Sequence, residues 1–159
     1  MIYIKNKSKL KTIESYINLA AGFAKYSECK KSQRGVVIVK NDSVIGIGYN
    51  LPMKKELCCA REKIHDNRTA ELCSAIHAEE MAIIDALKKS YSLSGSRLYY
   101  IKLKDGKISP SGNPSCTRCS TKILYSGISE VVLLHKEGYA VYYSKEFNDL
   151  SFNYFLKKK

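Results

Sequence analysis

The chain has 159 residues, of which 45% are hydrophobic and 26% charged, and it carries a net charge of +12 at neutral pH. This composition is typical of one soluble globular domain over residues 1–159, and no apolar stretch approaches the roughly 20 residues that a membrane helix requires. The N-terminus shows no apolar signal core, so we expect a cytoplasmic protein with no membrane partner.

The first elements along the chain are a helix and a hairpin. Apolar residues recur at helical spacing over residues 11–27, which predicts an amphipathic helix. Two segments rich in β-branched residues follow, residues 34–40 and 43–50. Asn41 and Asp42 separate them, and such a pair is typical of a tight turn, so we expect a β-hairpin.

The middle of the chain combines a polar insertion with a helix and a strand. Residues 51–75 are polar and predict a loop or an irregular insertion. Residues 75–90 then have few polar positions in their middle, which predicts a covered helix. A strand is expected over residues 96–104, followed by a loop over residues 104–114.

The last third predicts a helix over residues 116–127, ended by a glycine, and then two strands within residues 128–143. A short helix over residues 145–156 closes the chain. The alternation of helices and strands predicts an α/β fold with a central sheet covered on both faces. Only about three residues separate the last two strands, which favours an antiparallel pair.

Two cysteines lie at the start of the predicted helix over residues 116–127. Cys116 and Cys119 are three residues apart, so both sulfurs project from one helical turn and can reach one metal ion. The helix N-terminus favours their thiolate forms. His77, also at a loop-to-helix junction, can supply a third ligand. Three protein ligands and an open fourth position are typical of catalytic zinc.

Glu79 follows two residues after His77. In the middle of a helix these side chains would diverge by roughly 200°, so they can share a site only if His77 lies at the helix mouth. A carboxylate beside the metal but not bound to it can take a proton from water and deliver it elsewhere. His-x-Glu followed by Pro-Cys-x-x-Cys is the signature of zinc nucleobase deaminases.

Beyond this motif, the chain resembles the cytidine and deoxycytidylate deaminase superfamily over about residues 10–135, and most closely its deoxycytidylate branch. The segments that carry the resemblance are "SECKKSQRGVVIVKNDSVIGIGYN", "CCAREKI", "ELCSAIHAEEMAII", "LYYIK" and "PSCTRCSTKILYSGISEVVLL". The resemblance implies a three-layer α/β/α fold with a central mixed five-stranded sheet, usually assembled into homo-oligomers.

The resemblance also implies a function and its residues. We expect hydrolytic deamination of a cytosine nucleotide, with dCMP converted to dUMP and ammonia. It implies zinc on His77, Cys116 and Cys119, Glu79 as the catalytic proton shuttle, and substrate contacts from Asn50 and Ala78.

Three features depart from the family pattern. Ser115 intervenes between Pro114 and Cys116, so the loop is one residue longer than in Pro-Cys-x-x-Cys. Met81 stands where the deoxycytidylate branch usually has asparagine. The expected antiparallel final pair also differs from the branches that insert a helix there. These departures leave the substrate branch open.

The remaining cysteines are candidates for binding a second zinc ion. They fall where some deoxycytidylate deaminases hold a second, structural zinc, and a polar insertion with little core suits such a metal clip. The alternative is that these cysteines are small buried apolar residues. The candidate ligands are Cys29, Cys58, Cys59, Cys73 and His65.

The positive net charge does not decide whether the protein binds nucleic acid. A positive surface attracts nucleotides, RNA or DNA. However, only 5 of the 27 basic residues are arginines, and the lysines are scattered along the chain, as on an ordinary solvated surface. Two alternatives therefore accompany a small-nucleotide deaminase. One is a deaminase acting on cytosine or adenine in tRNA or single-stranded nucleic acid, and the other is a non-catalytic zinc-binding module.

Overall fold

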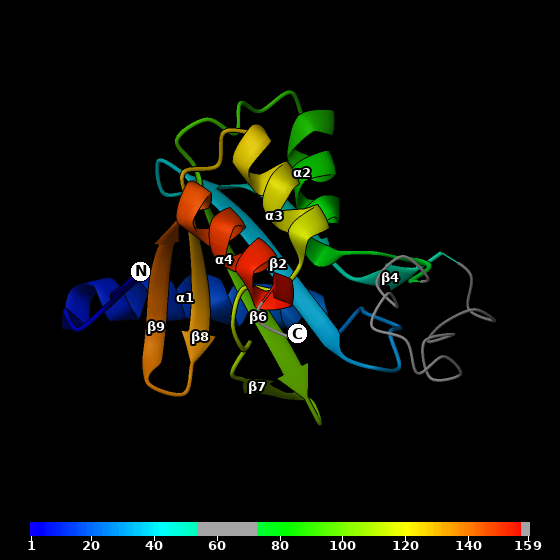
Figure 1. Ribbon diagram of the computed structural model, residues 1–159, viewed down its shortest axis with the longest axis horizontal. Helices are drawn as coiled ribbons and strands as arrows, with labels where there is room; N and C mark the ends of the chain where they lie inside the picture. Colours follow the sequence, from blue (N-terminus) through cyan, green and yellow to red (C-terminus); the bar gives the residue numbers. More distant parts are fainter. Residues whose placement is uncertain (54–72, 157–159) are drawn as a thin grey trace.

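The computed structural model describes residues 1–53 and 73–156. The helices are α1 (Lys7–Ala24), α2 (Ala78–Lys88), α3 (Thr117–Tyr125) and α4 (Ser144–Leu156). The strands are β1 (Ile2–Tyr3), β2 (Gln33–Lys40), β3 (Ser43–Tyr49), β4 (Leu51–Pro52), β5 (Ala75–Ile76), β6 (Arg97–Lys104), β7 (Lys107–Ser109), β8 (Glu130–His135) and β9 (Gly138–Tyr143). A central sheet has α1 on one face and α2, α3 and α4 on the other (Figure 1), which confirms the predicted three-layer α/β/α fold.

The central sheet is mixed, as predicted. Its strands follow the order β1-β9-β8-β6-β2-β3, and β7 pairs with β6. Among the strand pairs of the described residues, β6 and β8 run parallel and the others antiparallel. The antiparallel pairing of β8 with β9 is therefore confirmed.

The strand count differs from the expected five. Five long strands are present, and β1 and β7 add two and three residues at the margins. β7 lies within residues 104–114, where the prediction of a loop was wrong in part. β4, in the predicted insertion, pairs with β5, whose two residues lie where the helix predicted over residues 75–90 was expected to begin. These strands are too short to show the alternation of polar and apolar residues by which a strand is recognised.

Alternate residues of the strands pack into two hydrophobic clusters, one on each face of the sheet. Val36 and Ile38 pack in the cluster shared with α2, α3 and α4, whereas Val37 and Val39 pack against α1. This alternation follows from the two-residue period of a strand, and it explains why the four consecutive residues 36–39 of β2 are all apolar and buried. Every residue of β2 can thus be assigned to one of the two faces.

Helix α2 rests directly on the backbone of β3. A Cβ atom on Gly48 would lie 2.2 Å from the carbonyl oxygen of Ala78 and 2.5 Å from the backbone nitrogen of Ala82. One on Gly46 would lie 2.5 Å from the carbonyl oxygen of Ala82. The absence of side chains at these two glycines allows the close approach, which fixes the first turn of α2 over the end of β3.

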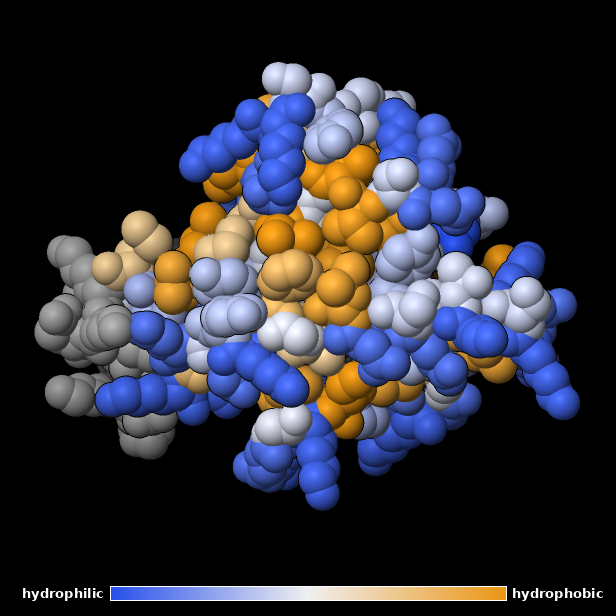
Figure 2. All heavy atoms as spheres, turned by 180° about the vertical axis from the view of Figure 1, so that it is seen from behind, coloured by the Kyte–Doolittle hydropathy of each residue, from blue (hydrophilic) through white to orange (hydrophobic). Residues whose placement is uncertain are grey.

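The described residues include no helix that is long and apolar enough to cross a membrane. From behind, hydrophilic side chains surround an apolar centre and form no continuous block over the described part of this face (Figure 2). The high net charge is therefore not gathered into one extended patch on that side.

Candidate metal and catalytic site

His77 is the residue at which the chain enters α2. Its φ and ψ of −79° and 154° are extended, and it is the N-cap of the helix. The histidine thus lies at the N-terminus of the helix, as the spacing to Glu79 requires. Because its backbone is not helical, its side chain does not follow the direction of the helical side chains. The close contact between α2 and β3 fixes this position relative to the sheet.

Cys116 is the equivalent residue of α3. It is the N-cap, and its sulfur accepts a hydrogen bond from the backbone N–H of Cys119, with 3.4 Å between nitrogen and sulfur. His77 Nδ1 lies 3.2 Å from the sulfur of Cys119 and 3.6 Å from that of Cys116. The structure thus brings all three predicted ligands together.

The chemistry of this cluster fits zinc. One ligand atom from each of the three residues lies within 4.8 Å of the others. In residues 1–53 and 73–156 this is the one group of three or more metal-donor side chains. A histidine nitrogen and two cysteine sulfurs are preferred zinc ligands, and three of them leave a tetrahedral position for water or substrate.

The three donors share protons through their hydrogen bonds. The hydrogen bond with Cys119 lowers the pKa of Cys116 to about 4, whereas the same bond and burial raise the pKa of Cys119. The hydrogen bond with Cys116 raises the pKa of His77 to about 9. Because a metal needs deprotonated ligands, binding at this site is coupled to the release of these protons.

Glu79 is buried beside the donors, with 9% of its surface exposed. Burial, reinforced by the negative charge of Cys116, raises the pKa of the Glu79 carboxyl, and the charges of His77 and Arg34 oppose this rise. A carboxyl whose pKa is raised holds a proton more readily than an ordinary carboxyl, as the acid step of a proton shuttle requires. Its position and chemistry suit a proton shuttle.

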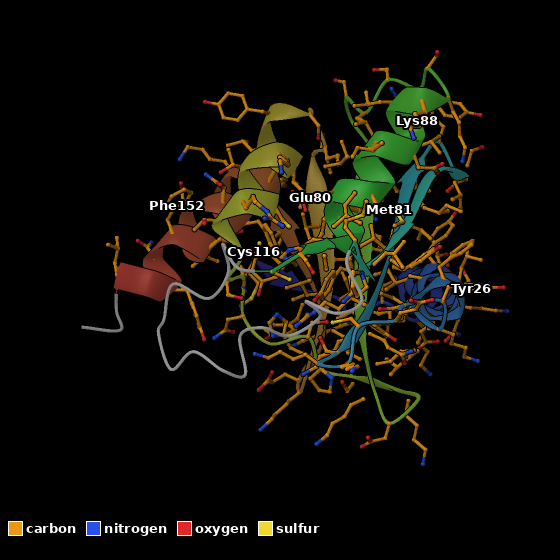
Figure 3. The ribbon with its side chains drawn as sticks, turned by 90° about the vertical axis from the view of Figure 1, so that its right-hand side faces the viewer. Tyr26, Glu80, Met81, Lys88, Cys116 and Phe152 are labelled. Atoms are coloured by element: carbon orange, nitrogen blue, oxygen red, sulfur yellow. The ribbon has the colours of Figure 1, made fainter. Side chains whose placement is uncertain are left out.

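Glu80, the next residue, is 8% exposed and lies between α2 and α3. Its carboxylate accepts a hydrogen bond from the backbone N–H of His77 at 3.0 Å and pairs with Arg118 at 3.1 Å and with Lys122. Figure 3 shows Glu80 on α2 and Cys116 at the start of α3.

Asn50, one of the two expected substrate residues, is buried next to this site. Its Oδ1 accepts hydrogen bonds from the Ser27 hydroxyl and from the Arg34 backbone N–H, both at 2.8 Å. Its Nδ2 donates to the Ser32 carbonyl at 2.9 Å. One Nδ2 hydrogen therefore remains for a ligand. Ala78, the other expected residue, is fully buried and turns its carbonyl oxygen toward Gly48.

Met81 occupies the position where the deoxycytidylate branch usually has asparagine. Its sulfur accepts a hydrogen bond from the Tyr49 backbone N–H, with 3.4 Å between nitrogen and sulfur (Figure 3). The methionine thus supplies one weak acceptor to β3 but no donor. Ser115, the additional residue before Cys116, is half-buried in the loop that enters α3.

Of the five residues expected at a second metal site, the structure describes Cys29 and Cys73. Cys29 and Cys73 are half-buried, and Cys73 lies close enough to His77 to hydrogen-bond with it. Cys58, Cys59 and His65 lie outside the described residues. The second zinc stays a prediction.

Comparisons with known proteins agree with this site. The profile of the family described as "Cytidine and deoxycytidylate deaminase zinc-binding region" matches residues 10–135. Deoxycytidylate deaminase of Saccharomyces cerevisiae is 34% identical over 122 residues, which are 74% of this chain and 35% of that protein. Deoxycytidylate deaminase of Mycobacterium phage D29 is 31% identical over 129 residues, 75% of this chain and 91% of that protein. The chain thus spans about a third of the yeast relative and most of the phage relative.

Solved structures share the fold. The dCMP deaminase from cyanophage S-TIM5 in complex with dCMP and dUMP has a TM-score of 0.56 and 27% identity, covering 81% of this chain and 82% of that one. A mutant cytidine deaminase from Mycobacterium tuberculosis has a TM-score of 0.53 at 16% identity, covering 86% of this chain and 92% of that one. The second likeness supports the fold alone.

Proposed function

The chain belongs to the cytidine and deoxycytidylate deaminase family, and on that premise we propose that it is a zinc-dependent enzyme that hydrolyses dCMP to dUMP and ammonia. The observation that carries the proposal is the cluster of His77, Cys116 and Cys119 within 4.8 Å, with the buried Glu79 carboxyl beside it. Two relatives named deoxycytidylate deaminase and one neighbour solved with dCMP and dUMP support the substrate.

In this proposal His77, Cys116 and Cys119 would hold a zinc ion, which when bound would supply an activated water for attack on C4 of the cytosine ring. Glu79 takes one proton of that water and gives it to the ring nitrogen. It then takes the second proton from the hydroxyl formed at C4 and gives it to the amino group, which leaves as ammonia. Because its pKa is raised by burial and by Cys116, Glu79 can hold the proton between these transfers. One water enters and one ammonia leaves for each dCMP.

The deciding experiment is ammonia release and UV change with purified, zinc-loaded protein and dCMP. We expect turnover in the wild type and none in Glu79→Ala, with the same zinc content in both. Retained turnover in the variant would reject the role of Glu79. A zinc-loaded wild type that releases no ammonia would reject the small-nucleotide substrate.

The two other functions predict different results in the same preparation. A deaminase of tRNA or single-stranded nucleic acid would bind RNA with a steep dependence on salt concentration. A non-catalytic module would hold zinc tightly with all four positions filled by protein. Within the described residues three donors converge, which favours an open catalytic position.

We also propose that the chain assembles into homo-oligomers. A groove between α2 and α3 supports this, since its lining includes the apolar side chains of Ile83, Ile84 and Tyr125. Ile84 is 42% exposed and Tyr125 87% exposed. Large apolar side chains grouped on a surface are typical of interfaces. Sedimentation velocity should show a species larger than one chain that Tyr125→Arg reduces, and a wild-type monomer would contradict the proposal.

The chain is further proposed to act as one domain in the cytoplasm, where a reducing environment keeps cysteine ligands as thiols. Fractionation of the source cells and limited proteolysis test these two points. Recovery of the protein outside the cytoplasm, or its cleavage into two stable fragments, would contradict them.

A further inference from the structure

A row of polar side chains crosses the sheet beside the metal donors. Arg34 on β2 is paired in register with Lys102 on β6, and Lys102 is paired with Ser109 on β7. On the other side of Arg34, the backbone N–H of Asn50 donates to the Arg34 carbonyl oxygen at 3.3 Å. Four segments therefore place an amide, two cations and a hydroxyl along one line.

This row lies on the face that carries α2 and α3. Val36 lies two residues from Arg34 on β2, and Tyr100 lies two residues from Lys102 on β6. Both pack in the hydrophobic cluster that includes residues of α2 and α3. Because side chains two residues apart share a face, Arg34 and Lys102 share that face too. The neighbouring residues Gln33 and Leu103 belong to the opposite face, where Leu103 packs against α1.

The row also lies at the end of the sheet where the donors are. Gly48 is paired with Val36 across the two strands and contacts the first turn of α2 at Ala78. Arg34 lies two residues further along β2 on the same face, toward the N-terminus of α2. The Arg34 charge also acts on the Glu79 carboxyl. Arg34 and Lys102 are thus within the reach of a small ligand whose reactive end is at the donors.

Neither Arg34 nor Lys102 forms an ion pair with a side chain of the described residues. Like charges directly opposite one another on a sheet destabilise it. The ion pairs between described side chains join Glu80, Asp85, Glu130, Glu146 and Asp149 to other cations. Arg34 donates to the Ser32 hydroxyl at 3.0 Å and lies over the Tyr100 ring, 5.6 Å from its centroid. These contacts orient the guanidinium but leave its charge and other donors available.

We propose that Arg34 and Lys102 recognise the 5′-phosphate of the substrate and so select a nucleoside monophosphate over a nucleoside. Arginine offers a planar fork to phosphate oxygens, and lysine adds a second charge. The Ser109 hydroxyl, paired in register with Lys102, borders the two cations and donates a long hydrogen bond to the Lys102 carbonyl oxygen at 3.5 Å. The inference deepens the proposed function, since the base would lie at the zinc donors and the phosphate at this row.

A single phosphate suits the row better than a nucleic-acid strand does. Arg34, Lys102 and Ser109 are half-buried, and the row is confined to one register position of the sheet. A polynucleotide requires cations spaced along its backbone. The neighbouring row on the same strands consists of Val36 and Tyr100, which are buried in the core.

Two measurements on zinc-loaded protein test the proposal. The first is the ratio of kcat/KM for dCMP to that for deoxycytidine, and the second is the ratio of the Kd values of dUMP and deoxyuridine by calorimetry. We expect Arg34→Gln and Lys102→Gln each to reduce the preference for the phosphorylated compound about tenfold to hundredfold, the worth of a hydrogen bond to a charged group. Lys11→Gln, which removes an exposed lysine of α1, is the matched control and should leave both ratios unchanged.

Unchanged ratios in the Arg34 and Lys102 variants would overturn the inference, as would equal losses for nucleotide and nucleoside. The Kd values of dUMP and deoxyuridine do not depend on turnover, so calorimetry distinguishes failure of this inference from failure of the proposed function. If the wild type deaminates nothing, the proposed function fails, while the dUMP preference still decides the role of the two cations. If these variants instead lose only the binding of a single-stranded oligonucleotide, the row serves a nucleic acid and the inference is wrong.

Discussion

Glu80 and Arg118 join the two helices that carry the metal donors. Glu80 Oε2 lies 3.1 Å from an Arg118 guanidinium nitrogen and 3.0 Å from the backbone nitrogen of His77. The Glu80 carboxylate therefore contacts both the backbone of His77 and Arg118 in the first turn of α3. The distance between His77 and Cys119 depends on this contact as well as on the core.

The first prediction concerns Glu80→Ala. Loss of the carboxylate leaves the His77 N–H without its acceptor, which we expect to cost about 1–3 kcal/mol of unfolding free energy. Because residues that orient metal ligands affect metal binding, zinc affinity should fall about 10- to 100-fold. Competition with a chelator measures the affinity, and denaturant titration measures the stability.

Asp85→Ala is the matched control for Glu80→Ala. Asp85 is on the same helix and accepts from the Ile47 backbone N–H at 2.9 Å, but it faces β3. This variant should lose stability and keep its zinc affinity. Equal losses of zinc affinity in the two variants would show that Glu80 contributes only to folding.

The second prediction concerns pH. Burial alone would raise the pKa of Glu80, but hydrogen bonds from Lys122 and the His77 N–H, with the Arg118 charge, lower it below its ordinary value of 4.5. A carboxyl with a lowered pKa stabilises the fold above the unfolded-state pKa, and this contribution is lost as the pH falls through the folded-state pKa. Wild-type stability should therefore fall more steeply below pH 4.5 than that of Glu80→Gln. Parallel slopes in denaturant titrations would contradict this.

The third prediction concerns Glu79→Gln. The amide keeps the size of the side chain but cannot shuttle a proton, so kcat should fall by at least about 10²- to 10⁴-fold. Zinc content should remain that of the wild type. Because dCMP would no longer be consumed, its Kd becomes measurable by calorimetry. Asp149→Asn, which makes the same change on the exposed face of α4, should keep wild-type kcat.

The fourth prediction concerns removal of zinc. A ligand that binds only the folded state stabilises it by about 2.7 kcal/mol at a free concentration of 100 times its Kd, so a chelator should lower the Tm. Cys119→Ser should bind zinc weakly and show no such shift. Zinc affinity should also rise with pH, because the pKa values of Cys119 and His77 are raised and both must lose protons. An identical chelator response in Cys119→Ser would contradict the site.

The fifth prediction concerns Gly48→Ala. The new methyl group would collide with backbone atoms of α2, which cannot rotate away, so we expect a loss of about 3 kcal/mol or more in unfolding free energy. The displacement of α2 should also weaken zinc binding through His77. Gly22→Ala is the control, since no atom lies within 4 Å of a Cβ there and alanine favours a helix. A stable, zinc-binding Gly48→Ala would refute the close contact.

The long elements and the donor cluster could be predicted from the sequence because each rests on a local pattern. Asn41 and Asp42 have φ values of 49° and 58°, the left-handed conformation of the predicted hairpin turn. His77 had to lie at a helix mouth to share a site with Glu79, and it does so. Periodicity and spacing carry this information within a few residues of the chain.

The features that were missed depend on neighbours distant in the sequence. Glu80 looks exposed until α3 is placed beside it, although a glutamate three residues after a helix start can reach the cap backbone. The pairing of Arg34 with Lys102 requires the register of β2 and β6, and a shift of one residue would place them on opposite faces. β7 has three residues and no periodic signal.

The contact of α2 with β3 has a consequence for how this protein can change over generations. Main-chain atoms of α2 set the distance between the helix and the strand at Gly48, and at Gly46 the Ala86 methyl group joins them. Neighbouring core residues such as Ile45 or Ile83 can therefore be exchanged for others of similar volume without moving His77. Volume-conserving exchanges of this kind leave the site in place, whereas a side chain at Gly48 would collide with the backbone of α2 and displace it.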